Sequence, residues 1–172
     1  MSAQSELTPT EAVYKGIKDA GIDFIVSVPC VNLKELIPMV DADPDIIHVP
    51  VTREEEGVGV CAGAFMGGKR PAMLMQNSGL GNSINALASL NQLYGIPLLM
   101  IMSHRGVEGE PISAQVPMGQ LTAPLLETLS IPYFIPDSRQ ESTEMIITAM
   151  DTAFGKKKSV AVLLPIPFWR QT

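Results

Sequence analysis

The stretch that decides the fold is "PAMLMQNSGLGNSINALASLNQLYGIPLLMIMS", residues 71–103. It opens on an apolar run at 71–76, passes through polar and glycine-rich positions into an amphipathic segment at 82–94, and ends on a second apolar run at 96–103. Continuous apolar runs of this length are typical of strands buried on both faces. The stretch therefore predicts a strand, a helix and a second strand parallel to the first.

The same alternation continues on both sides of this unit. Further apolar runs predict strands at 23–29, 45–51, 132–135 and 159–165, and the segments between them predict helices at 9–20, 33–40, 54–68, 121–129 and 138–154. Thr8 is expected to cap the first helix and Asn32 the second, in which Pro38 should cost a hydrogen bond or a kink, and Gly155 should end the last. We expect an α/β fold: a three-layer αβα sandwich whose mostly parallel sheet has roughly six strands.

Composition narrows the class of protein. The 172 residues are 46% hydrophobic, which suits a single domain over residues 1–172. A net charge of −6 argues against nucleic-acid binding. No apolar run approaches a membrane span and the polar start lacks a signal pattern, so we expect a cytoplasmic protein with no membrane contact. Cys30 and Cys61 lie far apart in apolar contexts and are predicted to be buried free thiols.

The segment "QNSGLGNS", residues 76–83, fails the usual nucleotide fingerprints. It has neither the third glycine of a dinucleotide site nor the lysine of a P-loop. Two interpretations remain open. It forms a tight strand-to-helix turn with its cap, or its backbone approaches a flat ligand to which Asn77, Ser78 and Asn82 offer hydrogen bonds.

Three acids, Glu54, Glu55 and Glu56, begin a predicted helix that also carries several glycines. Acids at a helix start are commonly a solvated capping cluster, and successive helical residues point in different directions, so at most one of the three can face a given ligand. The glycines at 57, 59 and 63 predict that this helix approaches a neighbour closely, including a possible subunit contact.

Two potential cations, His104 and Arg105, end the strand predicted at 96–103. Arginine can clamp an anionic substrate and histidine can transfer a proton. The alternative is a surface turn in which Arg105 pairs with Glu108 or Glu110. His48 lies within an apolar strand and is predicted to be a satisfied core histidine rather than a ligand.

Together, "VPCVNL", a glutamate before a Gly/Ala-rich helix, "MQNSGLGNSINALASL" and "HRGVEGEP" resemble the pyrimidine-binding domain of thiamine-diphosphate decarboxylases. Within that superfamily the chain is most similar to alpha subunits of sulfopyruvate decarboxylases, with phosphonopyruvate decarboxylases next. The family places a glutamate nine residues before a helix glycine, and Glu54 to Gly63 fits this spacing. The match selects Glu54 over its two neighbours.

The resemblance implies a site. In the family, the glutamate hydrogen-bonds a ring nitrogen of the cofactor's aminopyrimidine and so promotes removal of the thiazolium proton. Glu54 would be catalytic, His104 and Arg105 would contact the substrate, and the cofactor would lie against Glu54, Pro29, Asn77, Ser78, Gly79, Leu80, Gly81 and Asn82. The implied reaction converts 3-sulfopyruvate to sulfoacetaldehyde and carbon dioxide in coenzyme M biosynthesis. The alternatives are decarboxylation of phosphonopyruvate or another anionic 2-oxo acid, and a non-catalytic α/β binding module.

The resemblance also implies a partner. Family members hold Mg²⁺ and the diphosphate through a G-D-G motif with a following asparagine, and this motif does not occur in the sequence. We therefore expect a separate beta subunit to bind the diphosphate and Mg²⁺, with no metal ligand in this chain. Alone, the chain should have little or no activity and should make homodimeric contacts.

Overall fold

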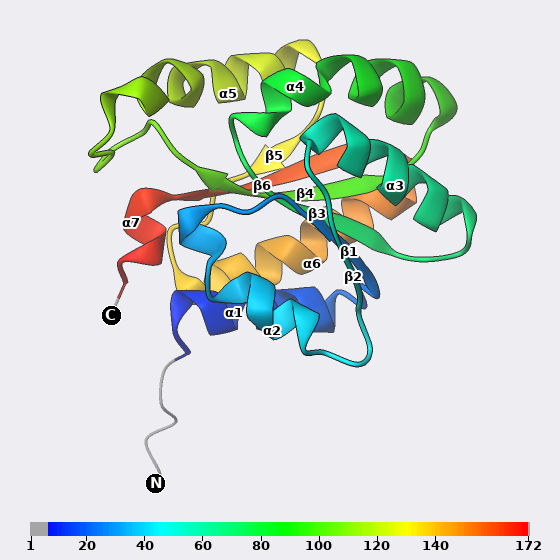
Figure 1. Ribbon diagram of the computed structural model, residues 1–172, viewed down its shortest axis with the longest axis horizontal. Helices are drawn as coiled ribbons and strands as arrows, with labels where there is room; N and C mark the ends of the chain where they lie inside the picture. Colours follow the sequence, from blue (N-terminus) through cyan, green and yellow to red (C-terminus); the bar gives the residue numbers. More distant parts are fainter. Residues whose placement is uncertain (1–6, 172) are drawn as a thin grey trace, which may run out of the picture.

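The computed structural model describes residues 7–171, in which six parallel strands form one sheet in the order β2-β1-β3-β4-β6-β5. Helices cover both faces of the sheet (Figure 1), so the predicted three-layer α/β architecture is confirmed. The strands are β1 Phe24–Ser27, β2 Ile47–Pro50, β3 Pro71–Gln76, β4 Leu98–His104, β5 Tyr133–Phe134 and β6 Ser159–Pro165.

Two hydrophobic cores lie on opposite faces of this sheet. One is covered by α1 Pro9–Asp19, α2 Leu36–Asp41, α6 Arg139–Lys156 and α7 Ile166–Trp169, and the other by α3 Glu54–Met66, α4 Gly79–Ala86 and α5 Val116–Thr128 (Figure 1). Along β4, Leu99 and Ile101 enter the first core while Met100 and Met102 enter the second. Burial on both faces explains why the strands are continuous apolar runs.

The start of α1 forms as predicted, but the start of α2 does not. Thr8 and Glu11 form a reciprocal capping box at α1. Asn32 caps no helix; it lies in the 3-10 turn Val31–Leu33, and its amide donates instead to Ser103 Oγ at 3.0 Å. Because α2 begins only at Leu36, Pro38 lies in its first turn, where backbone N–H groups have no partner within the helix, so the expected cost does not arise.

Three other helix limits differ from the predictions. The helix expected from residue 82 begins at Gly79, and a π-helical segment, Leu87–Gln92, follows α4. The helix expected from residue 121 begins at Val116. Gly155 lies inside α6, which ends at Lys156 and is capped by Lys157 in the left-handed conformation with φ 49°.

Two predictions from composition can be compared with the structure directly. Cys30 and Cys61 are both free thiols, although only Cys61 is fully buried. Of the helices within residues 7–171, none has the length and apolar character needed to span a membrane.

Two glycines bring α5 against the segment that follows β4. Gly106 has φ +76°, which disfavours any residue with a side chain, and a Cβ there would lie 2.0 Å from the carbonyl oxygen of Gln115. On the facing helix, a Cβ at Gly119 would lie 2.2 Å from the carbonyl oxygen of Gly106. The contact is therefore backbone against backbone and cannot yield by a change of rotamer.

We expect Gly119→Ala to destabilise the protein by about 1 to 3 kcal/mol, because the added methyl group meets fixed backbone. Urea denaturation measures the loss. Gly59→Ala is the matched control: it too lies inside a helix, and a Cβ there meets no described atom within 4 Å, so it should leave stability unchanged or raise it by up to about 1 kcal/mol. Equal stability of the two variants would contradict the close contact.

A second prediction concerns Asp43, whose buried carboxylate accepts from Tyr14 OH at 2.7 Å and pairs with Lys18 Nζ at 2.7 Å. The hydrogen bonds from Lys18 and Tyr14 lower the pKa of Asp43 to about 2. A lowered pKa means that this stabilisation is complete at neutral pH, above the unfolded value, and is lost as the pH falls through about 2.

Asp43→Asn should therefore lower the urea midpoint near neutral pH, and the difference from wild type should shrink as the pH falls from about 4 to 2. Asp151→Asn, at an exposed position of α6, controls for the change in net charge. A variant as stable as wild type at neutral pH would show that the cluster contributes nothing.

Candidate functional site

The topology places a ligand-binding edge at the carboxyl ends of the central strands. The chain passes from β1 to β2 on one side and returns to β3 on the other, so the strand order reverses at β1. Ligands of open parallel sheets bind at such a switch point. Pro29 follows β1, Asn77 follows β3 and Arg105 follows β4, so three separate predicted site segments meet at this edge.

Glu54 is the first residue of α3 and is buried, with 9% of its surface exposed. Its side chain lies directly against Gly79: a Cβ at Gly79 would be 2.2 Å from Glu54 Cγ. Asn82 Nδ2 donates to Glu54 Oε2 at 3.1 Å. The other oxygen, Oε1, forms no hydrogen bond with any residue of the described chain and also lies against Gly79, where a Cβ would be 2.5 Å away, so one oxygen is held by Asn82 and the other keeps its capacity to accept a hydrogen bond.

The two neighbouring acids have different partners. Glu55 Oε1 pairs with Arg53 Nε at 2.6 Å, and Glu56 Oε2 accepts from the backbone N–H and hydroxyl of Thr52 at 3.3 and 3.0 Å. Only one of the three carboxylates therefore lies against α4, as the 100° helical step requires. The first turn of α3 combines a capping cluster with one candidate catalytic acid.

The glycines of α3 also differ in what they face. A Cβ at Gly57 would meet Met73 Cε at 2.8 Å and Val26 Cγ1 at 3.0 Å, so Gly57 allows α3 to approach the sheet. A Cβ at Gly59 or Gly63 would meet no described atom within 4 Å. The close approach predicted for the helix thus exists within the described chain at Gly57 alone.

The glycine-rich stretch is mostly helix rather than loop. Asn77 and Ser78 form a short turn, and α4 begins at Gly79. Leu80 is fully buried in the core, whereas Gly81 and Asn82 are exposed. Of the side chains predicted to line a cofactor, Leu80 faces the core and Asn82 faces Glu54.

Asn77 is 1% exposed and joins three elements. Its Nδ2 donates to the Arg105 carbonyl at 3.1 Å and to Thr122 Oγ1 at 2.8 Å, and its Oδ1 accepts from the Arg105 N–H at 2.9 Å. These bonds continue the β3–β4 pairing beyond the point where the main chain turns into α4. Both amide hydrogens of Asn77 are used inside the protein, which makes it a positioning residue; nothing in the sequence marks Thr122 as its partner.

His104 and Arg105 are both buried and both engaged. His104 Nε2 lies 3.4 Å from the Gly119 carbonyl oxygen, and burial lowers the pKa of His104, which favours the neutral ring. Arg105 forms a two-point pair with Glu110, from Nε at 2.7 Å and from Nη2 at 2.6 Å. The arginine, through these hydrogen bonds, lowers the pKa of Glu110 to about 2.

Of the two partners considered for Arg105, the structure therefore selects Glu110, in a buried pair rather than a surface turn. His48 is satisfied as predicted: its ring nitrogens lie 2.8 Å from Ser27 Oγ and 2.8 Å from Asp41 Oδ1. Within residues 7–171, no group of three or more His, Cys, Asp or Glu residues could hold a metal ion.

A cavity of about 770 Å³ opens at this edge of the sheet. Gln76 lines it and links it to the Glu54 region, since Gln76 Nε2 donates to Ser78 Oγ at 2.8 Å and to Gln115 Oε1 at 2.9 Å. Its lining includes the predicted site residues Pro29 and Arg105, together with Cys30, Asn32, Lys34 and Arg170, which the sequence did not place in the site.

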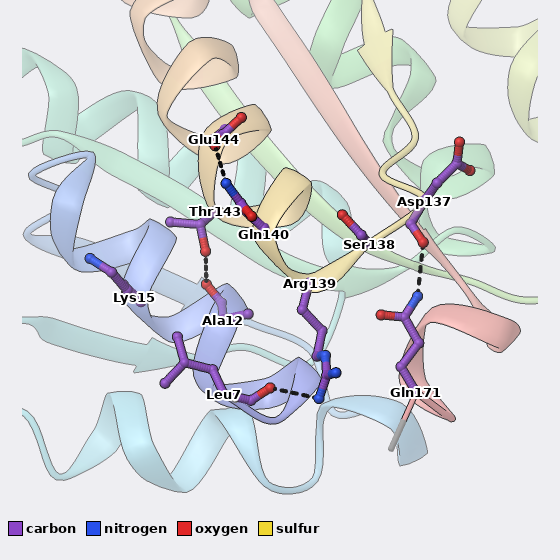
Figure 2. A pocket seen from close by; sticks show the side chains of 10 residues that line it. All are labelled: Leu7, Ala12, Lys15, Asp137, Ser138, Arg139, Gln140, Thr143, Glu144 and Gln171. Carbon is purple, nitrogen blue, oxygen red and sulfur yellow. Dashed lines mark hydrogen bonds between the residues drawn. The ribbon is translucent and has the colours of Figure 1, made fainter. Parts of the chain in front are cut away.

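A second hollow, of about 790 Å³, lies between α1 and α6 (Figure 2). Several of its polar side chains are bonded within the chain: Thr143 donates to the Ala12 carbonyl and Arg139 to the Leu7 carbonyl (Figure 2). None of the residues predicted for the site lines it, so the switch-point edge remains the candidate site.

Comparison with known proteins agrees with this geometry. Residues 7–124 match the family described as thiamine pyrophosphate enzyme, N-terminal TPP binding domain. In solved structures, the fold resembles 2-oxoglutarate:ferredoxin oxidoreductase from Magnetococcus marinus, with a TM-score of 0.74 and 14% identity over 94% of this chain and 29% of that one. A putative thiamin diphosphate-dependent enzyme from Mycobacterium smegmatis gives a TM-score of 0.71 at 15% identity, over 96% of this chain and 32% of that one.

Relatives with higher identity span the whole chain. Sulfopyruvate decarboxylase subunit alpha of Methanothermobacter thermautotrophicus is 61% identical over 93% of this chain and 97% of its own length. The subunit of the same name from Methanococcus maripaludis is 54% identical over 95% of this chain and 98% of its own. The chain therefore belongs to the family of sulfopyruvate decarboxylase alpha subunits, within the thiamine pyrophosphate enzymes.

Proposed function

We propose that this chain is the pyrimidine-binding subunit of a thiamine-diphosphate-dependent decarboxylase that converts 3-sulfopyruvate to sulfoacetaldehyde and carbon dioxide in coenzyme M biosynthesis. The observation that carries the proposal is Glu54, a buried carboxylate with one oxygen bound to Asn82 and the other without a hydrogen-bond partner among the described residues. It occurs in a chain that aligns over nearly its full length with sulfopyruvate decarboxylase alpha subunits.

The residues around Glu54 fit a flat aminopyrimidine. Gly79 has no side chain because Glu54 occupies that space, and Gly81 leaves the exposed start of α4 free of a side chain as well. A planar ring can therefore approach the exposed backbone at Gly81, beside Asn82 and Glu54, whose Oε1 has no hydrogen-bond partner among the described residues. Pro29 and Ser78, on neighbouring strand ends, would border the same ligand.

Thiamine diphosphate, when bound, supplies the electron sink that decarboxylation of a 2-oxo acid requires. The chain's own part is to hold and move a proton at Glu54. Asn82 orients the carboxylate, and the contact with Gly79 keeps water from that side, so that the hydrogen bond to the cofactor forms without competing solvent.

The rest of the enzyme would come from a beta subunit that binds the diphosphate and Mg²⁺. The relatives that this chain matches along nearly their whole length are named as subunits, whereas the chain spans only 41% of a Methanosarcina acetivorans protein named sulfopyruvate decarboxylase. The additional length of that protein supports the existence of a second functional part, which for this chain would lie on another polypeptide. The predicted single domain, homodimeric contacts in isolation and cytoplasmic location remain predictions.

The partner would close over the open face of α3 and the end of the α4 region. Gly59 and Gly63 leave this side of α3 without described neighbours, and Met66, Leu93 and Tyr94 are 78%, 68% and 70% exposed. Large apolar side chains exposed at the far ends of the two helical segments that meet at the catalytic carboxylate suit a protein interface. Such an interface would also complete the exclusion of water from Glu54.

Phosphonopyruvate decarboxylation is the nearest alternative, but it has weaker support. The phosphonopyruvate decarboxylase of Streptomyces viridochromogenes is 38% identical over 73% of this chain. A non-catalytic module would not need a buried acid held against a glycine, so the geometry of Glu54 favours the enzyme.

The direct test is to co-express the chain with its beta subunit and to purify the complex. We expect the complex to bind thiamine diphosphate in the presence of Mg²⁺, measured by calorimetry, and to release carbon dioxide from 3-sulfopyruvate. Each polypeptide alone should bind the cofactor more weakly and release carbon dioxide much more slowly. A stable complex that binds no thiamine diphosphate would overturn the proposal.

In that complex, Glu54→Gln should lower kcat by about 10²-fold or more, because an amide cannot exchange the proton that the carboxylate handles. Glu56→Gln is the matched control, since it makes the same change on the same helical turn at a carboxylate bound to Thr52. Circular dichroism and complex formation should be unchanged in both variants. Decarboxylation at the wild-type rate by Glu54→Gln would remove Glu54 from the mechanism.

A further inference from the structure

The cavity at the switch-point edge gathers positive charge in an acidic protein. Lys34, Arg105 and Arg170 line it, with Glu35 as the opposing charge in its lining. The whole chain has 12 lysines and arginines and a net charge of −6. The lining of this cavity is therefore opposite in sign to the protein as a whole. Such a site attracts an anion from solution.

Arg105 does not act there as an independent cation. Its Nε and Nη2 both bind Glu110, and the side chain of Glu110 is only 2% exposed, so the pair is neutral as a unit. The exposed charges that remain are Lys34 and Arg170 against Glu35. Their sum is one positive charge.

The Arg105–Glu110 pair instead supports Arg170. Glu110 also accepts from the N–H of Gly106 and of Ile112, at 2.9 and 3.0 Å, and so fixes the loop that contains Gly109. The Gly109 carbonyl accepts from Arg170 Nη2 at 3.4 Å. Arg170 is thus held at the cavity through one of its own N–H donors, and its other donors are available to a ligand.

The position of the cavity connects it to the reacting end of the site. Gln76 lines the cavity and hydrogen-bonds Ser78, which precedes Gly79, the residue packed on Glu54. A 2-oxo acid whose keto carbon lies near the cofactor could therefore extend its other end into this cavity.

From these observations we propose that Lys34 and Arg170 bind the anionic tail of the substrate, and that Glu35 tunes the cavity for a tail with a single negative charge. The inference rests on the proposed function. A sulfonate is a monoanion, whereas a phosphonate, like a phosphate ester, carries about −1.5 to −2 at pH 7. One net positive charge neutralises a sulfonate but leaves part of the negative charge of a phosphonate unneutralised, so the cavity selects sulfopyruvate over phosphonopyruvate.

The test uses the assembled complex and three 2-oxo acids: 3-sulfopyruvate, phosphonopyruvate and pyruvate, which has no charged tail. Lys34→Gln and Arg170→Gln should each lower kcat/KM for 3-sulfopyruvate about tenfold, the effect of losing one hydrogen bond to a charged group, and leave pyruvate unchanged. Glu35→Gln should raise the phosphonopyruvate to sulfopyruvate ratio of kcat/KM several-fold. Lys156→Gln and Glu144→Gln make the same charge changes at exposed positions of α6 outside this cavity and should alter neither.

Binding is measured separately by calorimetry with sulfoacetate, which has the sulfonate but no keto group. We expect Arg170→Gln to weaken sulfoacetate binding by the same factor as kcat/KM. Equal losses on sulfopyruvate and pyruvate, or an unchanged substrate ratio in Glu35→Gln, would overturn the inference while leaving the decarboxylase intact. A wild-type complex that bound sulfoacetate in an Arg170-dependent way but decarboxylated nothing would refute the proposed function and retain the anion site.

Discussion

The contact between Glu54 and Gly79 is the constraint on which the site depends. The glutamate side chain occupies the volume that any larger residue at position 79 would need. It therefore couples the start of α3 to the start of α4, and through them the ends of β2 and β3. A carboxylate placed in this way has one defined orientation, which a proton-transfer group requires, and needs no large movement to reach it.

Behind this contact, the site wall is held together by groups that hydrogen-bond one another within the chain. Asn77 extends the sheet with its side chain where the backbone can no longer do so, and the Gly106–Gly119 contact fixes α5 against the same segment. The buried Arg105–Glu110 pair then holds the loop after β4. Arginine and acid at a catalytic edge are commonly assigned to substrate, but here their first partner is each other, and the exposed cations at the cavity rim are separate residues.

The parts of the fold that the sequence predicted are those decided by burial. β3, β4 and β6 lie in the middle of the sheet and are apolar on both faces, so their runs are unmistakable, and the limits predicted for β6 agree with the structure. The errors occur where a tertiary contact overrides a local signal. Gly79 and Gly81 look like loop residues, yet both lie in the first turn of α4, and at Gly79 the missing side chain leaves the space that Glu54 fills. Gly155 looks like a stop, yet α6 continues to Lys156.

The site also has residues that the sequence predicted and residues that only tertiary contacts bring together. Glu54 could be chosen from its spacing to Gly63, and its placement apart from Glu55 and Glu56 follows from helical geometry. The inward role of Asn77 and the gathering of Lys34 with Arg170 could not be predicted, because residues 34 and 170 are distant in sequence and line one cavity only in the folded chain, where α7 packs against β6 and α1.

The π-helical segment Leu87–Gln92 follows α4 and leads directly to the exposed Leu93 and Tyr94. A π turn accommodates one residue more than an α turn, and each helical residue advances the direction of the chain by about 100°. Removing one residue from this segment would return it to α-helical geometry and leave Leu93 and Tyr94 facing as before, whereas removing one residue from the α-helical turns of α4 would rotate both by about 100°. The π segment therefore makes this stretch tolerant of a one-residue deletion, while the same deletion in α4 would turn these two exposed apolar groups away from their present direction and would act on assembly like a substitution at the interface.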